Sequence, residues 1–194
     1  VKEVLSDAAC ELMVVEAGSG QSLPSRITIL NSDGALQSLG ASSGVNLAVR
    51  PGIIYTSDGS ARFGLPAGNY TIYAGHGFEY SVDRIQIAVT TGQSVRQTLT
   101  LAREVSTEGW VACDPHVHTL THSGHGDATA QERMITLAAE GIELPVATDH
   151  NVHIDHRPFA QQANVSQYFT PVIGNEVTSH IGHVNIFPVK PGEQ

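Results

Sequence analysis

The sequence has little of what several classes of protein need. It holds only two cysteines, Cys10 and Cys113, too few for a disulfide framework or a cysteine-based zinc site. Lysine and arginine total 10 against 19 acidic residues, and the net charge of -9 argues against nucleic acid and anionic membranes as partners. No apolar run reaches the roughly 18 residues of a transmembrane helix. With 41% apolar and 15% charged residues, the composition is that of a globular chain.

Histidine is abundant by contrast, and it is unevenly distributed. Nine of the ten histidines lie in residues 105–194, together with ten acidic and three basic residues. Residues 1–104 hold nine acidic and seven basic residues and a single histidine, His76, which we expect in an ordinary hairpin loop. Imidazoles and carboxylates gathered with few bases suit a site for divalent cations. The shift in composition predicts two domains, 1–104 and 105–194.

The pattern of residues 1–104 is typical of an all-β domain. Arg26–Leu30 and Val95–Leu101 alternate polar and apolar residues, as half-buried strands do. Polar turns such as Asn31–Gly34 separate the candidate strands. Further strands are expected at Cys10–Val15, Ala61–Leu65, Tyr70–Ala74 and Asp83–Val89. Short strands with polar turns and no helical periodicity predict a β-sandwich.

Residues 105–194 alternate strands with helices. Thr129 and Glu132 form a capping box at the start of a helix that Gly141 ends, and a second, shorter helix is expected within 157–167. Strands are expected at Trp110–Asp114, Leu144–Thr148, Phe169–Gly174 and His183–Phe187. This order predicts parallel βαβ units and an α/β domain.

Residue types that bind metals follow three successive strands of this α/β domain. His116 and His118 are two residues apart on an extended segment, so both imidazoles project to one face. Asp149 and His150 follow the next strand, and Glu176 follows the third. The carboxyl ends of parallel strands form the rim where β/α barrels build their active sites. The spacing therefore predicts a metal site at this rim.

Two resemblances to known families extend these predictions. Phe63–Ile72 (FGLPAGNYTI) resembles the strand–turn–strand motif of carboxypeptidase-regulatory-like (transthyretin-like) domains, which implies an accessory β-sandwich over about residues 10–103. Four later segments resemble, in order, motifs of the PHP (polymerase and histidinol phosphatase) superfamily, and one longer phrase, HTLTHSGHGDAT at 118–129, is similar to its CehA/McbA branch of metallohydrolases. The four segments are DPHVHT at 114–119, ATDHN at 147–151, GNEVTS at 174–179 and GHVNI at 182–186.

The PHP resemblance implies a distorted β/α barrel with up to three divalent ions, which are zinc, manganese or iron. His116 and His118 would hold the first ion. Glu176 would bridge it to a second ion, which His183 would also serve, with His180 as a rival for that place.

A third ion would be held by His150 and by a partner late in the first motif. His125 fits that place, and His122 and Asp127 are its rivals. The resemblance also implies catalytic roles for Glu176 and for Asp149, which would accept a proton or orient a ligand. Asp114 fits an orienting role, and two further histidines, His153 and His156, are expected to be loop residues. Cys113 is expected to be a buried strand residue, with a disulfide to Cys10 as the alternative.

The function that this resemblance implies is a metal-dependent hydrolase. A metal-activated water would attack an ester, carbamate or phosphoester of a small-molecule substrate. The alternative is a binding or adhesion module in which the β-sandwich is the functional part and the metal site is structural or degenerate. The expected location is outside the cytoplasm, periplasmic or secreted.

The sequence departs from the PHP pattern at its end. It stops at Gln194, before the later motifs with which that superfamily completes its metal sites. The resemblance therefore implies the incomplete front part of a barrel, with little activity of its own. An open sheet edge of this kind favours self-association or a covering partner.

Overall fold

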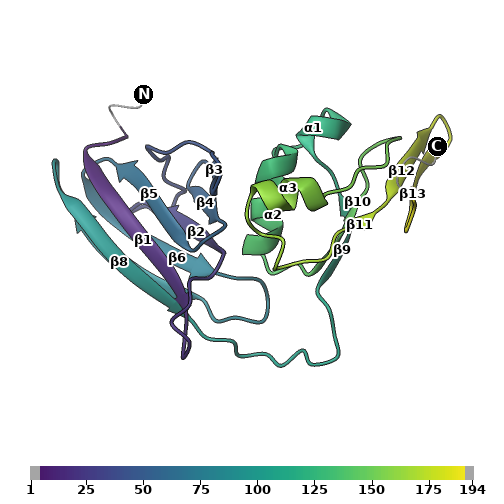
Figure 1. The fold of residues 1–194 in the computed structure, drawn as a ribbon. Helices are drawn as coiled ribbons and strands as arrows, with labels where there is room; N and C mark the ends of the chain where they lie inside the picture. Colours follow the sequence, from purple (N-terminus) through teal and green to yellow (C-terminus); the bar gives the residue numbers. More distant parts are fainter. Residues whose placement is uncertain (1–4, 191–194) are drawn as a thin grey trace.

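The computed structural model describes residues 5–190, and its first part is a sandwich of two β-sheets (Figure 1). One sheet has three strands in the order β5 (Ser60–Leu65), β1 (Ala8–Glu16), β8 (Ser94–Leu101). The other has five strands in the order β3 (Leu47–Arg50), β4 (Ile53–Thr56), β2 (Ser25–Leu30), β6 (Gly68–Gly75), β7 (Asp83–Val89). Strands β1 and β8 are parallel, and every other pair in the two sheets is antiparallel.

Alternate residues of these strands face the space between the two sheets. Ile27 and Ile29 of β2, Ile72 of β6 and Leu99 of β8 are completely buried there. The polar residues between them face outward, because successive side chains of a strand point to opposite faces. The predicted β-sandwich over the first part of the chain is thus confirmed.

The hairpin of β3 and β4 is an element that the sequence analysis missed. Each strand has only four residues, and Pro51 and Gly52 form the turn between them. Gly52 has a φ of 73°, a conformation that glycine adopts at little cost. The Pro-Gly pair is a turn signal, and it could have revealed the hairpin.

The second part contains a parallel sheet covered by two short helices. Its strand order is β11 (Val172–Ile173), β10 (Leu144–Ala147), β9 (Cys113–Val117), and both pairings are parallel. A single turn, α1 (Leu120–Ser123), follows β9. Helix α2 (Ala130–Ala139) then leads to β10, and α3 (Arg157–Gln162) leads from β10 to β11.

The expected boundaries of α2 are confirmed. The Thr129 hydroxyl accepts the backbone N–H of Glu132, and the Glu132 carboxylate accepts the backbone N–H of Thr129, which completes the capping box. Gly141 follows the helix with a φ of 66°, as a residue that ends a helix does.

The last two strands differ from the expected βαβ order and exclude a barrel. β12 (Asn175–Ser179) and β13 (Gly182–Ile186) form an antiparallel hairpin. Only His180 and Ile181 connect them, whereas a parallel crossover needs a dozen or more residues. Within residues 5–190 the strands close no barrel, and the hairpin departs from the alternating βαβ order that the front part of a barrel would continue. The fold is mainly β, with several sheets and few short helices.

Helix α2 packs on the outer face of the five-stranded sheet, beside β3 and β4 (Figure 1). Ala48 and Met134 are fully buried in one cluster, which Tyr55 also contacts. Arg50 of β3 pairs with Glu132 at 3.1 Å and with Asp127 at 3.2 Å. Because these contacts join residues before and after 104, the division into domains 1–104 and 105–194 stays a proposal.

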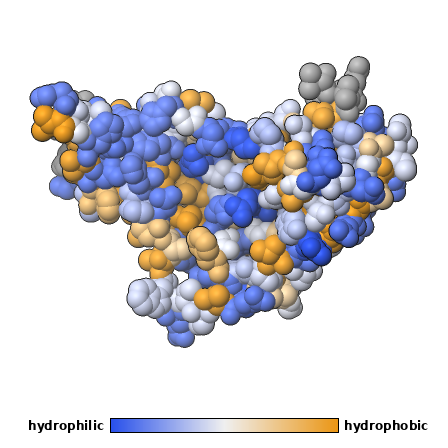
Figure 2. All heavy atoms as spheres, turned by 180° about the vertical axis from the view of Figure 1, so that it is seen from behind, coloured by the Kyte–Doolittle hydropathy of each residue, from blue (hydrophilic) through white to orange (hydrophobic). Residues whose placement is uncertain are grey.

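None of the helices in residues 5–190 is long and apolar enough to cross a bilayer. Polar side chains cover most of the C-terminal half on the face in Figure 2, with a small apolar patch at its outer edge. The β12–β13 hairpin carries exposed apolar side chains, among them Ile181 and Val184.

The two cysteines are free thiols, so the alternative of a Cys10–Cys113 disulfide is wrong. Cys10 lies in the core of the sandwich, and burial raises the pKa of its thiol to about 11. Cys113 is exposed, contrary to expectation, because it begins β9 at the edge of the three-stranded parallel sheet.

Residues 1–104 expressed alone are expected to fold as a β-sandwich without metal. All residues of the core between the two sheets lie between Ala8 and Leu101, so the fragment keeps this core and loses only the packing of Ala48 and Tyr55 against α2. Circular dichroism should show a β-type spectrum and a cooperative melt that a chelator does not shift. The zinc-loaded full chain, whose melt should shift with chelator, is the control. A helical spectrum, or a melt that chelator abolishes, would contradict this prediction.

Candidate metal centre

The candidate centre begins at the end of β9. His116 lies in this strand and His118 follows it, on either side of the buried Val117. As the two-residue spacing requires, their imidazoles face the same way, with the two Nε2 atoms 2.8 Å apart. The carboxylate of Asp114 accepts the backbone N–H of His116 at 3.1 Å. Asp114 therefore holds the backbone at this point and not the imidazole ring.

Glu176 lies at the centre of the histidines, and its side chain is only 7% exposed. Its Oε2 is 2.9 Å from His118 Nε2, 3.4 Å from His116 Nε2 and 3.2 Å from His150 Nδ1. Its Oε1 is 2.9 Å from His183 Nδ1 on the other strand of the hairpin. Burial alone would raise the pKa of the Glu176 carboxyl, but the hydrogen bonds from His183 and His116 outweigh it and lower the pKa.

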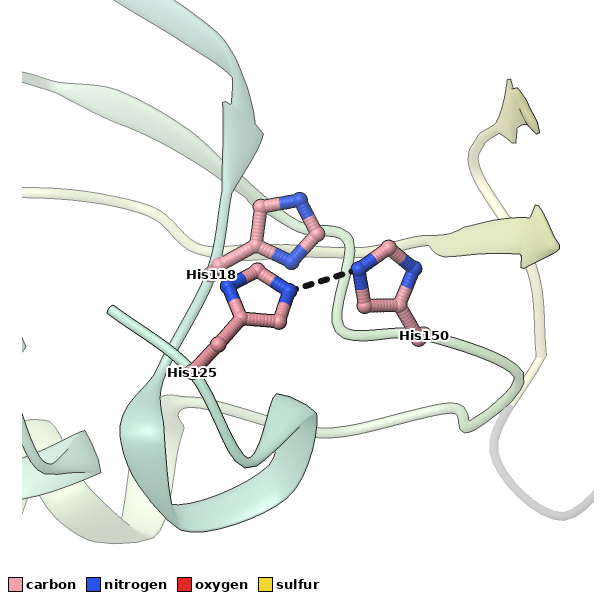
Figure 3. Close-up of side chains that lie close together, drawn as sticks. All are labelled: His118, His125 and His150. Atoms are coloured by element: carbon pink, nitrogen blue, oxygen red, sulfur yellow. Dashed lines mark hydrogen bonds between the residues drawn. The ribbon is translucent and has the colours of Figure 1, made fainter. Parts of the chain in front are cut away.

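A second group of candidate ligands consists of three imidazoles from three segments of the chain (Figure 3). His118 follows β9, His125 lies in the loop after α1, and His150 follows β10. The Nε2 atoms of His125 and His150 are 2.7 Å apart. Gly124 and Gly126 flank His125 with φ of 72° and 95°, and these turns bring the loop back toward His150. Burial lowers the pKa of His118, although the charge of Glu176 opposes the change.

The rival positions lie outside this cluster. The His122 ring packs edge-on against Phe159, with centroids 5.7 Å apart. The Asp127 carboxylate forms ion pairs with Arg50 and Arg133, and its Oδ1 lies 3.0 Å from a guanidinium nitrogen of Arg133. His180 is exposed and belongs to none of the ligand groups found in residues 5–190, whereas His183 reaches Glu176.

Asp149 is completely buried behind the cluster and does not face it. Its Oδ1 accepts the backbone N–H of Thr119 at 2.7 Å and the hydroxyl of Ser123 at 2.6 Å, and its Oδ2 lies 3.9 Å from His156 Nε2. Burial alone would raise the pKa of Asp149, but these partners lower it to about 2. His156 lies in the loop before α3, as expected, but it is fully buried beside Asp149. His76 is buried too, with Nδ1 2.6 Å from the Pro24 carbonyl oxygen.

Three supporting residues escaped the sequence analysis. The Ser123 hydroxyl lies 3.0 Å from His118 Nδ1, and the Thr178 hydroxyl lies 2.6 Å from His150 Nδ1. Asn151, with a φ of 55°, accepts the backbone N–H of Thr178 at 2.9 Å and fixes the loop after β10 to the hairpin. All three lie within the quoted motifs, but their partners are distant in sequence.

The six candidate ligands form three overlapping groups, in each of which the ligand atoms lie within 4.8 Å of one another. The groups are His118–His125–His150, His116–His118–Glu176 and His150–Glu176–His183. Imidazole nitrogens suit zinc, copper, nickel and iron, and a carboxylate also suits manganese. The residues therefore fit a divalent transition-metal ion, and His118, Glu176 and His150 each belong to two groups.

Comparison with known proteins does not identify the expected family. No family model matches the chain, and no curated protein matches it. Among similar solved structures, the minor pilin GBS52 of Streptococcus agalactiae is 13% identical with a TM-score of 0.39, over 53% of this chain and 47% of that chain. The major pilin subunit BcpA of Bacillus cereus is 14% identical with a TM-score of 0.38, over 51% of this chain and 31% of that chain. The shaft pilin SpaA of Lactobacillus rhamnosus GG is 16% identical with a TM-score of 0.37, over 50% and 46%. The chain thus spans less than half the length of these pilins.

The comparisons do not support the expectation of a PHP metallohydrolase: no family model matches the chain, and the similar structures reported are pilin subunits. No family model supports the carboxypeptidase-regulatory-like assignment of the sandwich either. The catalytic roles of Asp149 and Glu176 and the small-molecule substrate were implied only by the resemblance to a hydrolase, so we do not propose them for this chain. The physical reason is that a set of metal ligands defines what can bind, and a reaction needs further groups arranged around a substrate.

Proposed function

We propose that the chain is a binding module that holds a divalent transition-metal ion in its C-terminal half, where the ion has a structural role. One observation carries the proposal: six ligand side chains from four separate segments of the chain converge on one place. The segments are the end of β9, the loop after α1, the end of β10 and the β12–β13 hairpin.

The short distances between the imidazole nitrogens favour the binding of a cation. A neutral imidazole has one N–H and one lone pair, and protonated imidazoles repel one another. Nε2 of His118 lies 2.8 Å from another imidazole nitrogen, that of His116, and 2.9 Å from the Glu176 carboxylate. Atoms that carry lone pairs approach this closely only when a proton or a cation lies between them. A metal ion would satisfy several of these atoms at once.

The structural role follows from which segments the ligands connect. Glu176 and His183 come from the hairpin, whereas His116 and His118 come from the far edge strand of the parallel sheet. A two-stranded hairpin is marginally stable by itself. An ion bound to residues of both elements would fix the hairpin against the sheet. The β-sandwich would then act as the platform on which this metal-stabilised half is presented.

Two further expectations stay proposals. We place the chain outside the cytoplasm, periplasmic or secreted, which agrees with the pilin subunits among the similar structures. Self-association would use the hairpin, whose exposed Ile181 and Val184 offer apolar surface to a second copy.

The purified full chain is expected to bind zinc at neutral pH and to be stabilised by it. At free zinc a hundredfold above Kd, mass action adds about 2.7 kcal/mol to the free energy of unfolding. Affinity should fall as the pH is lowered from 7.5 to 5, because a protonated imidazole cannot coordinate a metal. Equilibrium dialysis with elemental analysis and a thermal melt measure both effects, with magnesium as the control ion. Absence of bound metal after incubation with zinc or manganese at neutral pH would contradict the proposal.

A further inference from the structure

A cleft lies at the C-terminal end of helix α2, where the helix meets the β-sandwich. Its volume is about 210 Å³, and it is lined by the loop between β6 and β7, by Arg103 and by residues that follow α2 and α3. The loop approaches the helix closely, because a Cβ atom on Gly77 would lie 2.6 Å from the Glu140 carbonyl oxygen. The cleft is separate from the candidate metal centre, since it shares no residue with the three ligand groups.

Aromatic rings surround this cleft. Tyr80 and Tyr168 line it from its two sides and are half-buried, whereas Phe78 is 96% exposed and leaves the face of its ring open to a ligand. A second depression, lined by Trp110, shares Tyr168 and Glu143 with the first. Trp110 is the single tryptophan of the chain and is 83% exposed. Exposed aromatic rings beside a concave surface are typical of binding sites.

Hydrogen bonds hold the segments that carry Phe78 and Trp110 together. The Glu79 carboxylate, next to Phe78, accepts the hydroxyl of Thr107, and the Thr107 carbonyl oxygen accepts the backbone N–H of Trp110 at 2.9 Å. The Glu79 carbonyl oxygen also accepts the backbone N–H of Glu104 at 2.8 Å. The exposed rings therefore stand on a fixed backbone, which lowers the entropy that a ligand would have to remove.

The electrostatics of the cleft favour a positively charged ligand. Of its three carboxylates, Glu79 pairs with Arg103, and Glu140 pairs with Arg26 at 2.9 Å. Glu143 forms no ion pair with any side chain of residues 5–190, so its negative charge is not neutralised. The C-terminal end of α2, which opens into the cleft, adds the partial negative charge of a helix C-terminus.

We propose that this cleft binds an organic cation, whose charge lies beside Glu143 and whose apolar surface lies against Phe78, Tyr80 and Tyr168. The face of an aromatic ring attracts a cation, and quaternary ammonium groups are recognised in this way. The guanidinium group of arginine also stacks on aromatic rings and is weakly hydrated. The ligand is therefore a quaternary ammonium or a guanidinium group, carried by a free small molecule or by a side chain of a partner protein.

A metal ion does not suit this cleft. Calcium and magnesium bind several oxygen ligands at once, and two of the three carboxylates here are already paired with arginine. None of the groups of metal-binding side chains found in residues 5–190 lies in the cleft. The position of Glu143 is itself fixed, because its Oε2 accepts the backbone N–H of Ala112 at 2.8 Å. The inference is independent of metal binding at the histidines.

Nuclear magnetic resonance of the full ¹⁵N-labelled chain, titrated with choline, tests the inference. Saturable shifts of the backbone N–H signals of Gly77, Glu79, Gly141 and Tyr168 are expected. The alcohol 3,3-dimethyl-1-butanol has the shape of choline without its charge and should cause none of these shifts at the same concentrations. A short peptide with one arginine, compared with the same peptide carrying neutral citrulline, tests the guanidinium group in the same way.

The two probes also distinguish the sources of the cation. Shifts with choline support a free small molecule, and shifts with the arginine peptide alone support a partner protein. Equal shifts with a cation and its neutral analogue would show that the cleft binds apolar surface and would overturn the inference. Absence of saturable shifts at the cleft with both cations would overturn it too.

Two pairs of variants assign the binding to the ring and to the carboxylate, with whichever probe binds. Phe78→Trp keeps an aromatic face and should bind at least as tightly as the parent chain, whereas Phe78→Leu should bind about 2–5-fold more weakly. Glu143→Gln loses the charge but still accepts the Ala112 N–H, and its affinity should fall about 2–5-fold. Glu108→Gln, at an exposed position outside the cleft, should leave the affinity unchanged. Parent-like affinity in both Phe78→Leu and Glu143→Gln would overturn the assigned site.

Discussion

Replacing His118 by alanine is expected to lower zinc affinity at least a hundredfold. His118 belongs to two of the three ligand groups, and its Nε2 lies between His116 and Glu176. Removal of an outer partner of a metal ligand already costs about 10–100-fold in affinity, so removal of a ligand itself should reach or exceed the upper end of that range. Competition with a chromophoric zinc chelator at neutral pH measures the change.

His180→Ala is the matched control for this prediction. It removes the same imidazole from an exposed position between β12 and β13, outside the ligand groups, and should leave zinc affinity unchanged. Melts of both variants without metal show whether either change disturbs the fold. If the two variants bind zinc equally well, the cluster around His118 is not the binding site.

Replacing Ile72 by alanine is expected to lower the free energy of unfolding by about 2–5 kcal/mol, the usual cost of such a change in a packed core. Ile72 is fully buried between the two sheets, on a strand that pairs with neighbours on both sides. Truncation removes buried apolar surface and leaves a cavity that the two sheets cannot close. Urea denaturation measures the loss.

The control for Ile72 is Val45→Ala, at a position that is 61% exposed in a loop of the same sandwich. A surface change of this kind should stay within about 0.5 kcal/mol. Zinc bound per folded chain should be the same in both variants, because the sandwich core holds none of the candidate ligands. A loss for Ile72→Ala no larger than for Val45→Ala would contradict the assigned core.

The sequence predicted those elements whose signals are local. The alternation in β2 and β8 reflects one buried and one exposed face, and the capping box at Thr129 is formed by residues three apart. The partner of a strand is a non-local property, and it is here that prediction failed. The pattern of His183–Phe187 correctly indicated a strand but not its antiparallel pairing with β12. The two-residue connection between those strands carried that information.

The candidate site shows the same division. Spacing placed His116 and His118 on one face, and strand order brought His150 and Glu176 to them. The contacts of Ser123 with Asp149 and of Thr178 with His150 join residues far apart in sequence, so only the folded chain reveals them. The reaction could not be predicted from these residues either. Ligands of one ion can serve catalysis or structure, and no family model supports the inferred hydrolase.

Anomalous diffraction at the zinc absorption edge, from crystals of the full chain grown with zinc, shows whether the ligand cluster binds zinc. We expect an anomalous peak within the three overlapping ligand groups, at zinc–nitrogen distances of about 2.0–2.1 Å. The peak should be absent from crystals of the His118→Ala variant. An anomalous map without a peak at any of the three ligand groups, or with peaks only at exposed histidines such as His180, would contradict the account.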